Sequence, residues 1–221
     1  MPGTEAPVGA QDWVPPQPAS IADLKAAAAG CQGCELYEHA TQTVFGRGAE
    51  HARIVFVGEQ PGDVEDQHGL PFVGPAGRLL REAVDDAGID PADLYITNAV
   101  KHFRFELRGK RRIHQTPGPA HIVACRPWLV AEFSLSKPDL VVALGATAAK
   151  ALFGATFRVT RSRGQLMPWP ASAEHPGDFP VAEIRAMATI HPSAVLRADN
   201  RDIAYAGLVE DLKVVVAALA G

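Results

Sequence analysis

Three cysteines and several histidines give this chain a candidate metal site. Cys31 and Cys34 form a C-x-x-C pair, in which Gly33 lets the backbone fold round a metal ion or a cluster, and Cys125 is the third thiol. Tetrahedral zinc or an iron–sulfur cluster needs a fourth ligand, and the candidates are His39, His102 and His121. Helical spacing favours His121, which shares a helix face with Cys125. The alternative is that Cys125 is a buried apolar thiol without a ligand role.

Other uses of these cysteines are less well supported. An odd number of cysteines at low density is not typical of a disulfide framework. The C-x-x-C pair follows a predicted helix end at Gly30, whereas a thioredoxin-like redox pair would follow a strand and begin a helix. A metal site is therefore the favoured interpretation.

A polar segment directly after the apolar run Arg53–Val57 has the residue types for acid–base chemistry. It contains Gly58, Glu59, Gln60 and Asp63. Carboxylates can polarise water or stabilise a developing cation, and glycine lets the backbone approach a ligand closely. An ordinary polar turn is the alternative interpretation.

Two side chains are suited to holding a planar base. Phe72, between Pro71 and Gly74, can stack on a ring, a contact worth about 1–3 kcal/mol. Asn98 ends a second apolar run and offers one acceptor and two donors to an amide or pyrimidine edge. The alternatives are a core phenylalanine and a turn asparagine.

A cationic segment lies within a chain whose formal net charge is −4. Between residues 101 and 114 there are six Lys and Arg residues against one acid: Lys101, Arg104, Arg108, Lys110, Arg111 and Arg112. Such a segment attracts phosphate, although most charged runs are simply solvated loops. The segment ends in His114, so an imidazole is presented to whatever the cations attract.

A second histidine, His191, ends a later apolar run and is followed by Ser193 and Arg197. Another basic segment, with Arg158, Arg161 and Arg163, is suited to a flanking phosphate.

The elements that must position these residues alternate along the chain. Apolar runs predict strands at Arg53–Val57, Leu94–Thr97, Leu140–Leu144 and Met187–Ile190. Helices are expected at Ile21–Ala29, with Ser20 as N-cap, and at Ala76–Ala87, His121–Phe133, Ala146–Phe153 and Ile203–Leu219. The pattern predicts an α/β fold, a three-layer α/β/α sandwich with a central, mainly parallel four-stranded sheet. The polar residues after the strands then meet at one sheet edge, where such folds bind ligands.

Length and composition fit one globular domain, with 221 residues, 47% hydrophobic and 21% charged. Residues 1–19 contain five prolines and are expected to form a flexible Pro-rich segment before a single domain over 20–221. Neither a membrane span nor a secretory signal is evident, so we expect a cytoplasmic monomer.

The order of these motifs resembles the family 4 iron–sulfur uracil-DNA glycosylases. The resemblance runs from Cys31 to Leu208 and is carried by Gly58-Glu59-Gln60-Pro61-Gly62, Pro71-Phe72-Val73-Gly74, Asn98 through His102, Ala124-Cys125-Arg126-Pro127 and His191-Pro192-Ser193. The insertion Lys110-Arg111-Arg112-Ile113-His114 resembles the hallmark of the UdgX subfamily, which binds uracil-containing DNA and becomes covalently joined to it.

The resemblance implies a [4Fe-4S] cluster held by Cys31, Cys34, His102 and Cys125. Typical family 4 members have a cysteine where this chain has His102, so the fourth ligand departs from the pattern, and His121 remains the alternative.

The resemblance also implies roles in excising uracil from DNA, with a preference for single strands. Phe72 would stack the base, Asn98 would read its imide edge, and His191 would donate to O2. Glu59 and Asp63 would be the carboxylates that stabilise the sugar cation, and Gln60 would position the sugar. The residues expected to contact the DNA substrate are Arg112, Arg197 and Gly58.

The UdgX-like insertion implies that His114 attacks C1′ of the sugar and stays bonded to it, so that the protein is consumed after one event. Two alternatives remain: a conventional multiple-turnover glycosylase, and a non-catalytic iron–sulfur module that binds single-stranded DNA.

Overall fold

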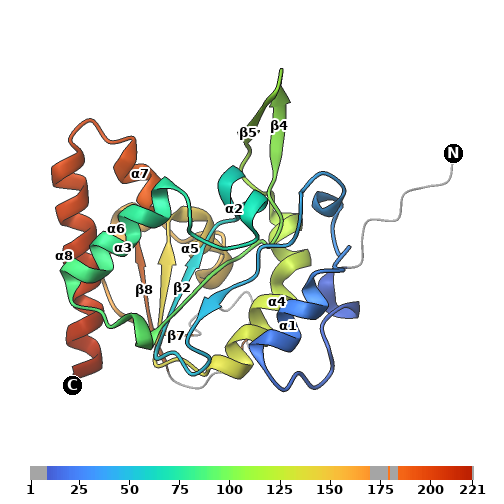
Figure 1. The fold of residues 1–221 in the computed structure, drawn as a ribbon. Helices are drawn as coiled ribbons and strands as arrows, with labels where there is room; N and C mark the ends of the chain where they lie inside the picture. Colours follow the sequence, from blue (N-terminus) through green and yellow to red (C-terminus); the bar gives the residue numbers. More distant parts are fainter. Residues whose placement is uncertain (1–8, 170–178, 180–183, 221) are drawn as a thin grey trace, which may run out of the picture.

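The fold, obtained as a computed structural model, is described over residues 9–169, 179 and 184–220 (Figure 1). Its centre is a six-stranded sheet of order β1-β3-β2-β6-β8-β7. The four inner strands run parallel: β3 (Leu94–Asn98), β2 (Ile54–Gly58), β6 (Leu140–Leu144) and β8 (Ile184–Thr189). All residues of β2, β3 and β6 are buried, as their continuous apolar sequences predict.

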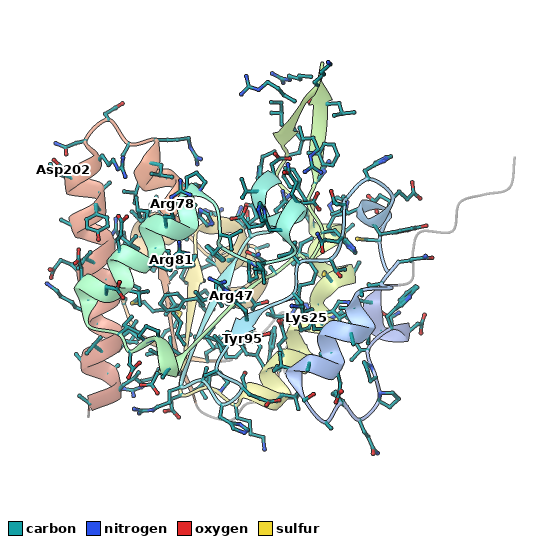
Figure 2. The ribbon with its side chains drawn as sticks, in the orientation of Figure 1. Lys25, Arg47, Arg78, Arg81, Tyr95 and Asp202 are labelled. Carbon is teal, nitrogen blue, oxygen red and sulfur yellow. The ribbon has the colours of Figure 1, made fainter. Side chains whose placement is uncertain are left out.

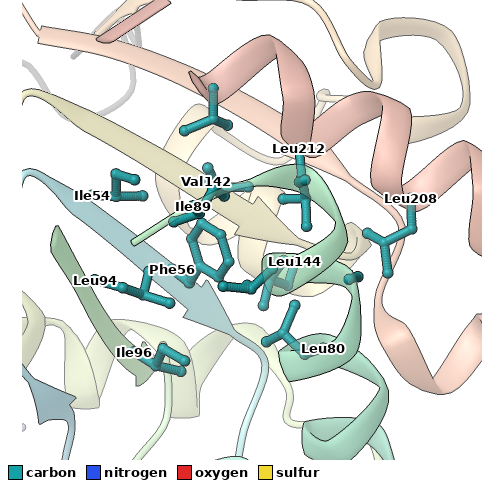
Figure 3. Close-up of a cluster of buried hydrophobic side chains, with 14 of the residues drawn as sticks. Ile54, Phe56, Leu80, Ile89, Leu94, Ile96, Val142, Leu144, Leu208 and Leu212 are labelled. Atoms are coloured by element: carbon teal, nitrogen blue, oxygen red, sulfur yellow. The ribbon is translucent and has the colours of Figure 1, made fainter. Parts of the chain in front are cut away.

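Helices cover both faces of this sheet (Figure 1). One face carries α3 (Pro75–Ala87), α7 (Pro192–Leu196) and α8 (Arg201–Ala220). Leu80 of α3 and Leu212 of α8 pack there against Phe56, in the cluster drawn in Figure 3. The opposite face carries α4 (Pro119–Ser136) and α5 (Ala146–Phe153), with α1 (Ile21–Ala28) packed on α4. The predicted three-layer α/β/α sandwich is therefore confirmed.

The sheet is wider than predicted. Two short antiparallel strands, β1 (Arg47–Gly48) and β7 (Met167–Trp169), extend the two edges of the four expected strands. They contain two and three residues, too few to produce an apolar run in the sequence.

The cationic segment forms a hairpin, not a loop. Strands β4 (Phe105–Arg108) and β5 (Arg111–His114) pair antiparallel in a separate sheet, which projects from the body of the molecule (Figure 1). Gly109 has φ +60° in the tight turn between them, a conformation that glycine adopts without strain.

Short helices complete the described chain: η1 (Ala10–Asp12), η2 (Glu35–Glu38), α2 (Asp63–His68), η3 (Pro91–Asp93) and α6 (Val159–Ser162). Within this part of the chain, no helix combines the length and the apolar character needed to cross a bilayer.

Residues 9–19 of the predicted flexible N-terminal segment lie within the described structure, and part of them contacts the domain. Ala10 is buried in a cluster with Leu24 and Trp128, and η1 packs on α4. An apolar residue at this point gains a buried contact that the proline content did not suggest. Residues 1–8 of the predicted segment lie outside the described residues.

Candidate active site

A pocket of about 550 Å³ opens where the parallel strands end. Its walls come from the segments that follow β2, β3, β6 and β8, which is the edge that the fold type predicted. Of the residues singled out from the sequence, the pocket is lined by Glu59, Gln60, Phe72, Asn98, His114, His191 and Arg197. The volume suits a small planar ligand such as a nucleobase.

Asn98 supplies an unused acceptor at the base of this pocket. It pairs in register with Gly58 on the neighbouring strand and is 2% exposed. Its Oδ1 is buried and has no hydrogen-bond partner among the described residues. A Cβ at position 58 would collide with this oxygen and would lie 2.6 Å from Cζ of Phe72. The lack of a side chain at Gly58 therefore leaves room for the side chains of Asn98 and Phe72.

Phe72 is held rigidly beside Asn98. Its φ is +54°, a left-handed conformation that is costly for a bulky residue. Arg81 donates from Nη1 to the Phe72 carbonyl at 3.0 Å, and a Cβ on Gly77 would collide with the same carbonyl. The ring is 6.0 Å from that of His191, centroid to centroid. This strained, well-anchored ring is a suitable stacking platform.

His191 is fixed as a neutral hydrogen-bond donor. It caps α7, and its Nδ1 accepts from the backbone N–H of Ser193 at 3.1 Å. Burial lowers the pKa of His191 to about 4, so the ring is neutral at pH 7. With Nδ1 accepting, the proton of the neutral ring lies on Nε2, which is free to donate to a ligand.

His114 and Glu59 form the polar contact at the pocket mouth. Nε2 of His114 lies 3.3 Å from Oε1 of Glu59, and the imidazole is about half exposed. Burial tends to raise the pKa of Glu59, but hydrogen bonds from His114 and Thr147 outweigh it, and the pKa is lowered. An ionised carboxylate therefore lies next to this imidazole.

The hairpin is anchored by residues for which the sequence suggested other roles. Arg112 forms ion pairs with Asp63 and, at 2.6 Å, with Asp66, and its guanidinium lies 5.1 Å from the centre of the Phe105 ring. Gln60 donates from Nε2 to the carbonyls of Arg104 and Gln115 at 3.1 and 3.0 Å.

The roles expected of Arg112 at the DNA, of Asp63 toward the sugar cation and of Gln60 in positioning the sugar stay predictions. Arg112 pairs with two carboxylates of α2. Asp63 and Gln60 bind the hairpin, although Gln60 also lines the pocket. Their partners lie tens of residues away in the chain, so local sequence could not indicate these interactions.

The three cysteines gather in one buried cluster with residues of α1 and α4. Cys31, Cys34 and Cys125 are free, buried and part of one cluster. The Trp128 indole donates to Sγ of Cys31 at 3.2 Å, and the Lys101 backbone N–H donates to Sγ of Cys125 at 3.3 Å. Burial raises the pKa of Cys125 to about 12.

The candidate histidine ligands differ in availability. His102 is buried, and burial lowers its pKa to about 4. His121 accepts from the Gly118 N–H through Nδ1 at 2.9 Å and lies 2.6 Å from Glu35 through Nε2, so both ring nitrogens are used. His39 is exposed. Among the residues that the structure describes, no group of three or more His, Cys, Asp or Glu side chains could hold a single metal ion.

Comparison with known proteins agrees with the fold. Residues 45–213 match the family model described as the uracil DNA glycosylase superfamily. This chain belongs to the uracil-DNA glycosylase superfamily. Within the superfamily it is similar to the type-4 uracil-DNA glycosylases of Thermotoga maritima, with 36% identity covering 78% of this chain and 81% of the relative. It is also similar to that of Pyrobaculum aerophilum, with 34% identity covering 76% and 80%.

A more distant similarity links this superfamily member to a DNA polymerase of Bacillus phage SP01, with 29% identity over 84% of this chain but 18% of the polymerase. The match corresponds to a small part of a much longer protein.

Several site residues escaped the sequence analysis. Asp66 is fully buried and accepts from the Thr41 N–H as well as from Arg112, and Glu65 accepts from the Gly74 N–H at 2.7 Å. Thr147 bonds Glu59. Acids, and a threonine, in a first helical turn are common features of exposed helix starts, so no local signal marked them.

Proposed function

We propose that this protein excises uracil from DNA, preferentially from single strands, and remains bonded to the abasic sugar through His114. The observation that carries the proposal is the placement of the His114 imidazole, beside the ionised Glu59, in one pocket with Phe72 and Asn98. The names of the type-4 relatives support uracil in DNA as the substrate class.

In this proposal the pocket binds an extruded uracil. Phe72 stacks on the ring, and the buried Oδ1 of Asn98 accepts from the uracil N3–H. Nε2–H of His191 donates to O2, where negative charge develops as the base departs. A neutral, preorganised donor stabilises that charge more in the transition state than in the ground state.

The proposed reaction breaks one bond to C1′ and forms another. The C1′–N1 bond breaks and its electron pair leaves with uracil, while C1′ becomes cationic beside the Glu59 carboxylate. The unprotonated nitrogen of His114 then bonds to C1′, and the ring becomes an imidazolium next to Glu59. The hairpin anchored by Arg112 delivers this nitrogen at high effective concentration, so capture outruns hydrolysis. An N-alkylated imidazolium is a poor leaving group, so the product persists.

A [4Fe-4S] cluster fits the chemistry of the cysteine site. Three thiols are buried, and two of them, Cys31 and Cys125, receive N–H donors from Trp128 and Lys101, the kind of hydrogen bond that stabilises ligand sulfur; His102 is held neutral. Ligands of a four-iron cluster bind different irons, so they are spaced more widely than the ligands of a single ion. We propose Cys31, Cys34, Cys125 and His102 as ligands; the bound cluster would serve to tie these segments together. Iron and sulfide analysis with the visible absorption spectrum distinguishes it from zinc, which is spectroscopically silent.

The central experiment mixes the protein with single-stranded DNA containing one uracil. We expect a complex that survives boiling in detergent, and mass spectrometry of the tryptic digest should place the sugar on His114. DNA with thymine at the same position is the control. Loss of the complex in His114→Ala supports the proposal, and an undiminished complex removes His114 from this role.

A conventional multiple-turnover glycosylase is the second candidate, and the names of the relatives favour it. Release of more than one free uracil per protein would establish it. If neither free uracil nor a covalent protein–DNA complex appears, a non-catalytic DNA-binding module is left.

A further inference from the structure

A buried ion pair lies on the α4 side of β3, and the proposed reaction does not use it. Nζ of Lys101 is 2.6 Å from Oε2 of Glu132, and both side chains are 1% exposed. Glu132 lies on α4 at a position two helical turns beyond Cys125. Charged groups so deeply buried are costly unless every donor and acceptor is satisfied.

The network around this pair is closed. Besides Glu132, the ammonium of Lys101 donates to Oγ1 of Thr97 at 2.7 Å and to the backbone carbonyl of Asn98 at 2.8 Å. The other carboxylate oxygen of Glu132 accepts from Thr97 and from Tyr95, labelled in Figure 2, both at 2.8 Å. All three protons of the ammonium and both oxygens of the carboxylate are therefore used.

Stability does not explain why these charges are buried. Replacing a buried ion pair by well-packed apolar residues of similar volume is often neutral or stabilising. Fully satisfied networks do rigidify their surroundings. The group most directly restrained here is the Asn98 carbonyl, at the last residue of β3.

The restrained residue also provides the free acceptor of the pocket. Thr97 and Asn98 point to opposite faces of the sheet, so the ion pair on the α4 side and the Asn98 amide in the pocket meet only through the Asn98 backbone. The backbone N–H of Lys101 binds Sγ of Cys125. Lys101 thus contacts Cys125 in the cysteine site, the carboxylate of Glu132 on α4 and the backbone carbonyl of Asn98 behind the pocket.

We propose that Lys101 and Glu132 are positioning residues for Asn98. They hold its carbonyl so that its amide points into the pocket, and they link that orientation to α4 and the cysteine site. The inference rests on the proposed function in one respect only, namely that the ligand of Asn98 is the excised base.

The test removes both charges together, because deleting one would leave the other buried and unpaired. Lys101→Met/Glu132→Leu is made in the wild-type and in the Asn98→Ala background, and the release of uracil base is followed with saturating single-stranded uracil DNA. In the wild-type background we expect a loss of about tenfold in rate, because a misplaced base misaligns the C1′–N1 bond. In the Asn98→Ala background we expect no further loss.

Ser136→Ala is the matched control, since Ser136 is buried on the same helix and bonds only the Glu132 backbone carbonyl in the described network. Its rate should equal that of the wild type. Equal losses in both Asn98 backgrounds, or an unchanged rate in the double variant, overturn the proposal.

A readout independent of activity separates this inference from the proposed function. The side-chain amide resonance of Asn98, assigned by its absence in Asn98→Ala, should shift in the double variant and stay fixed in Ser136→Ala. An unshifted resonance overturns the positioning role even if uracil is released normally. If the wild type releases no uracil, the proposed function fails, and the resonance still decides this inference.

Discussion

The shape of the pocket depends on close contacts between individual residues. Gly58, Asn98 and Phe72 occupy a space with no room for one more carbon, and Phe72 keeps a strained backbone because Gly77 and Arg81 hold its carbonyl. These chemical groups could be predicted because Gly58 and Asn98 end apolar runs and Phe72 lies between Pro71 and Gly74. How tightly they fit could not be predicted, since the partners come from separate segments.

Gly58→Ala tests this fit. The added Cβ would collide with Oδ1 of Asn98 and press on Phe72, so both side chains must move. We expect at least a tenfold loss of the uracil release rate, together with about 1–3 kcal/mol of destabilisation from overpacking. Single-turnover assays and thermal melting measure the two effects. Gly118→Ala is the control, because its Cβ would have an ordinary 3.6 Å contact with His121. Full activity in Gly58→Ala would show that the pocket tolerates the displacement.

His191 makes stability depend on pH. Its folded pKa of about 4 is below the value of about 6.5 in the unfolded chain, so protons bind the unfolded state more readily. The resulting stabilisation is complete above pH 6.5 or so and is lost as the pH falls through the folded pKa. Urea denaturation between neutral pH and pH 4.5 should show a steeper decline for the wild type than for His191→Asn, which keeps a capping side chain. Parallel curves would contradict a buried neutral His191.

At the scale of elements, prediction succeeded where the apolar pattern was continuous. Leu140–Leu144 and Ala146–Phe153 have the expected ends. The strand expected at Met187–Ile190 is observed at Ile184–Thr189. Its start was predicted too late because Arg185 interrupts the apolar run. The hairpin was missed because its two four-residue strands are exposed and charged, and its stability comes from contacts with α2 that local sequence does not encode.

Arg112→Met should loosen that hairpin. The variant keeps the bulk but removes the ion pairs with Asp63 and Asp66, so we expect faster amide hydrogen exchange over residues 105–114. The yield of the covalent complex should fall by about tenfold, because His114 is delivered less often to the sugar. Arg108→Met, at the exposed hairpin tip, changes the same charge and should leave the exchange rates unaltered. Unaltered exchange in Arg112→Met would show that Arg112 does not anchor the hairpin.

At the scale of the whole molecule, the cysteine site joins distant parts of the chain. Residues 10–34 contribute Ala10, Leu24 and Cys31 to a buried cluster, and α4 contributes Cys125 and Trp128. This region packs outside the two clusters that flank the sheet. The order of the cysteines could be read from the sequence, whereas the involvement of residues near position 10 could not.

Cys125→Ser should increase the mobility of residues 20–45 while the sheet stays folded. We expect loss of bound iron and faster proteolysis within residues 20–45, because the proposed cluster would no longer bridge this segment to α4. Metal analysis and limited proteolysis measure both effects. Ser134→Ala, on the same helix, is the control and should keep its iron. Retention of iron in Cys125→Ser would remove this cysteine from the ligand set.

The way in which the hairpin joins the rest of the chain has an evolutionary consequence. The backbone N–H of Gln115 bonds the carbonyl of Arg104, so the hairpin leaves and re-enters the body at adjacent points. Its removal would leave two ends that a single short connection can rejoin, with the central strands untouched. A lineage can therefore gain or lose this arm, and the proposed nucleophile His114 that it carries, as one insertion. Under the proposed function, grafting the arm between the corresponding positions of an ordinary glycosylase is a route to a trapping protein.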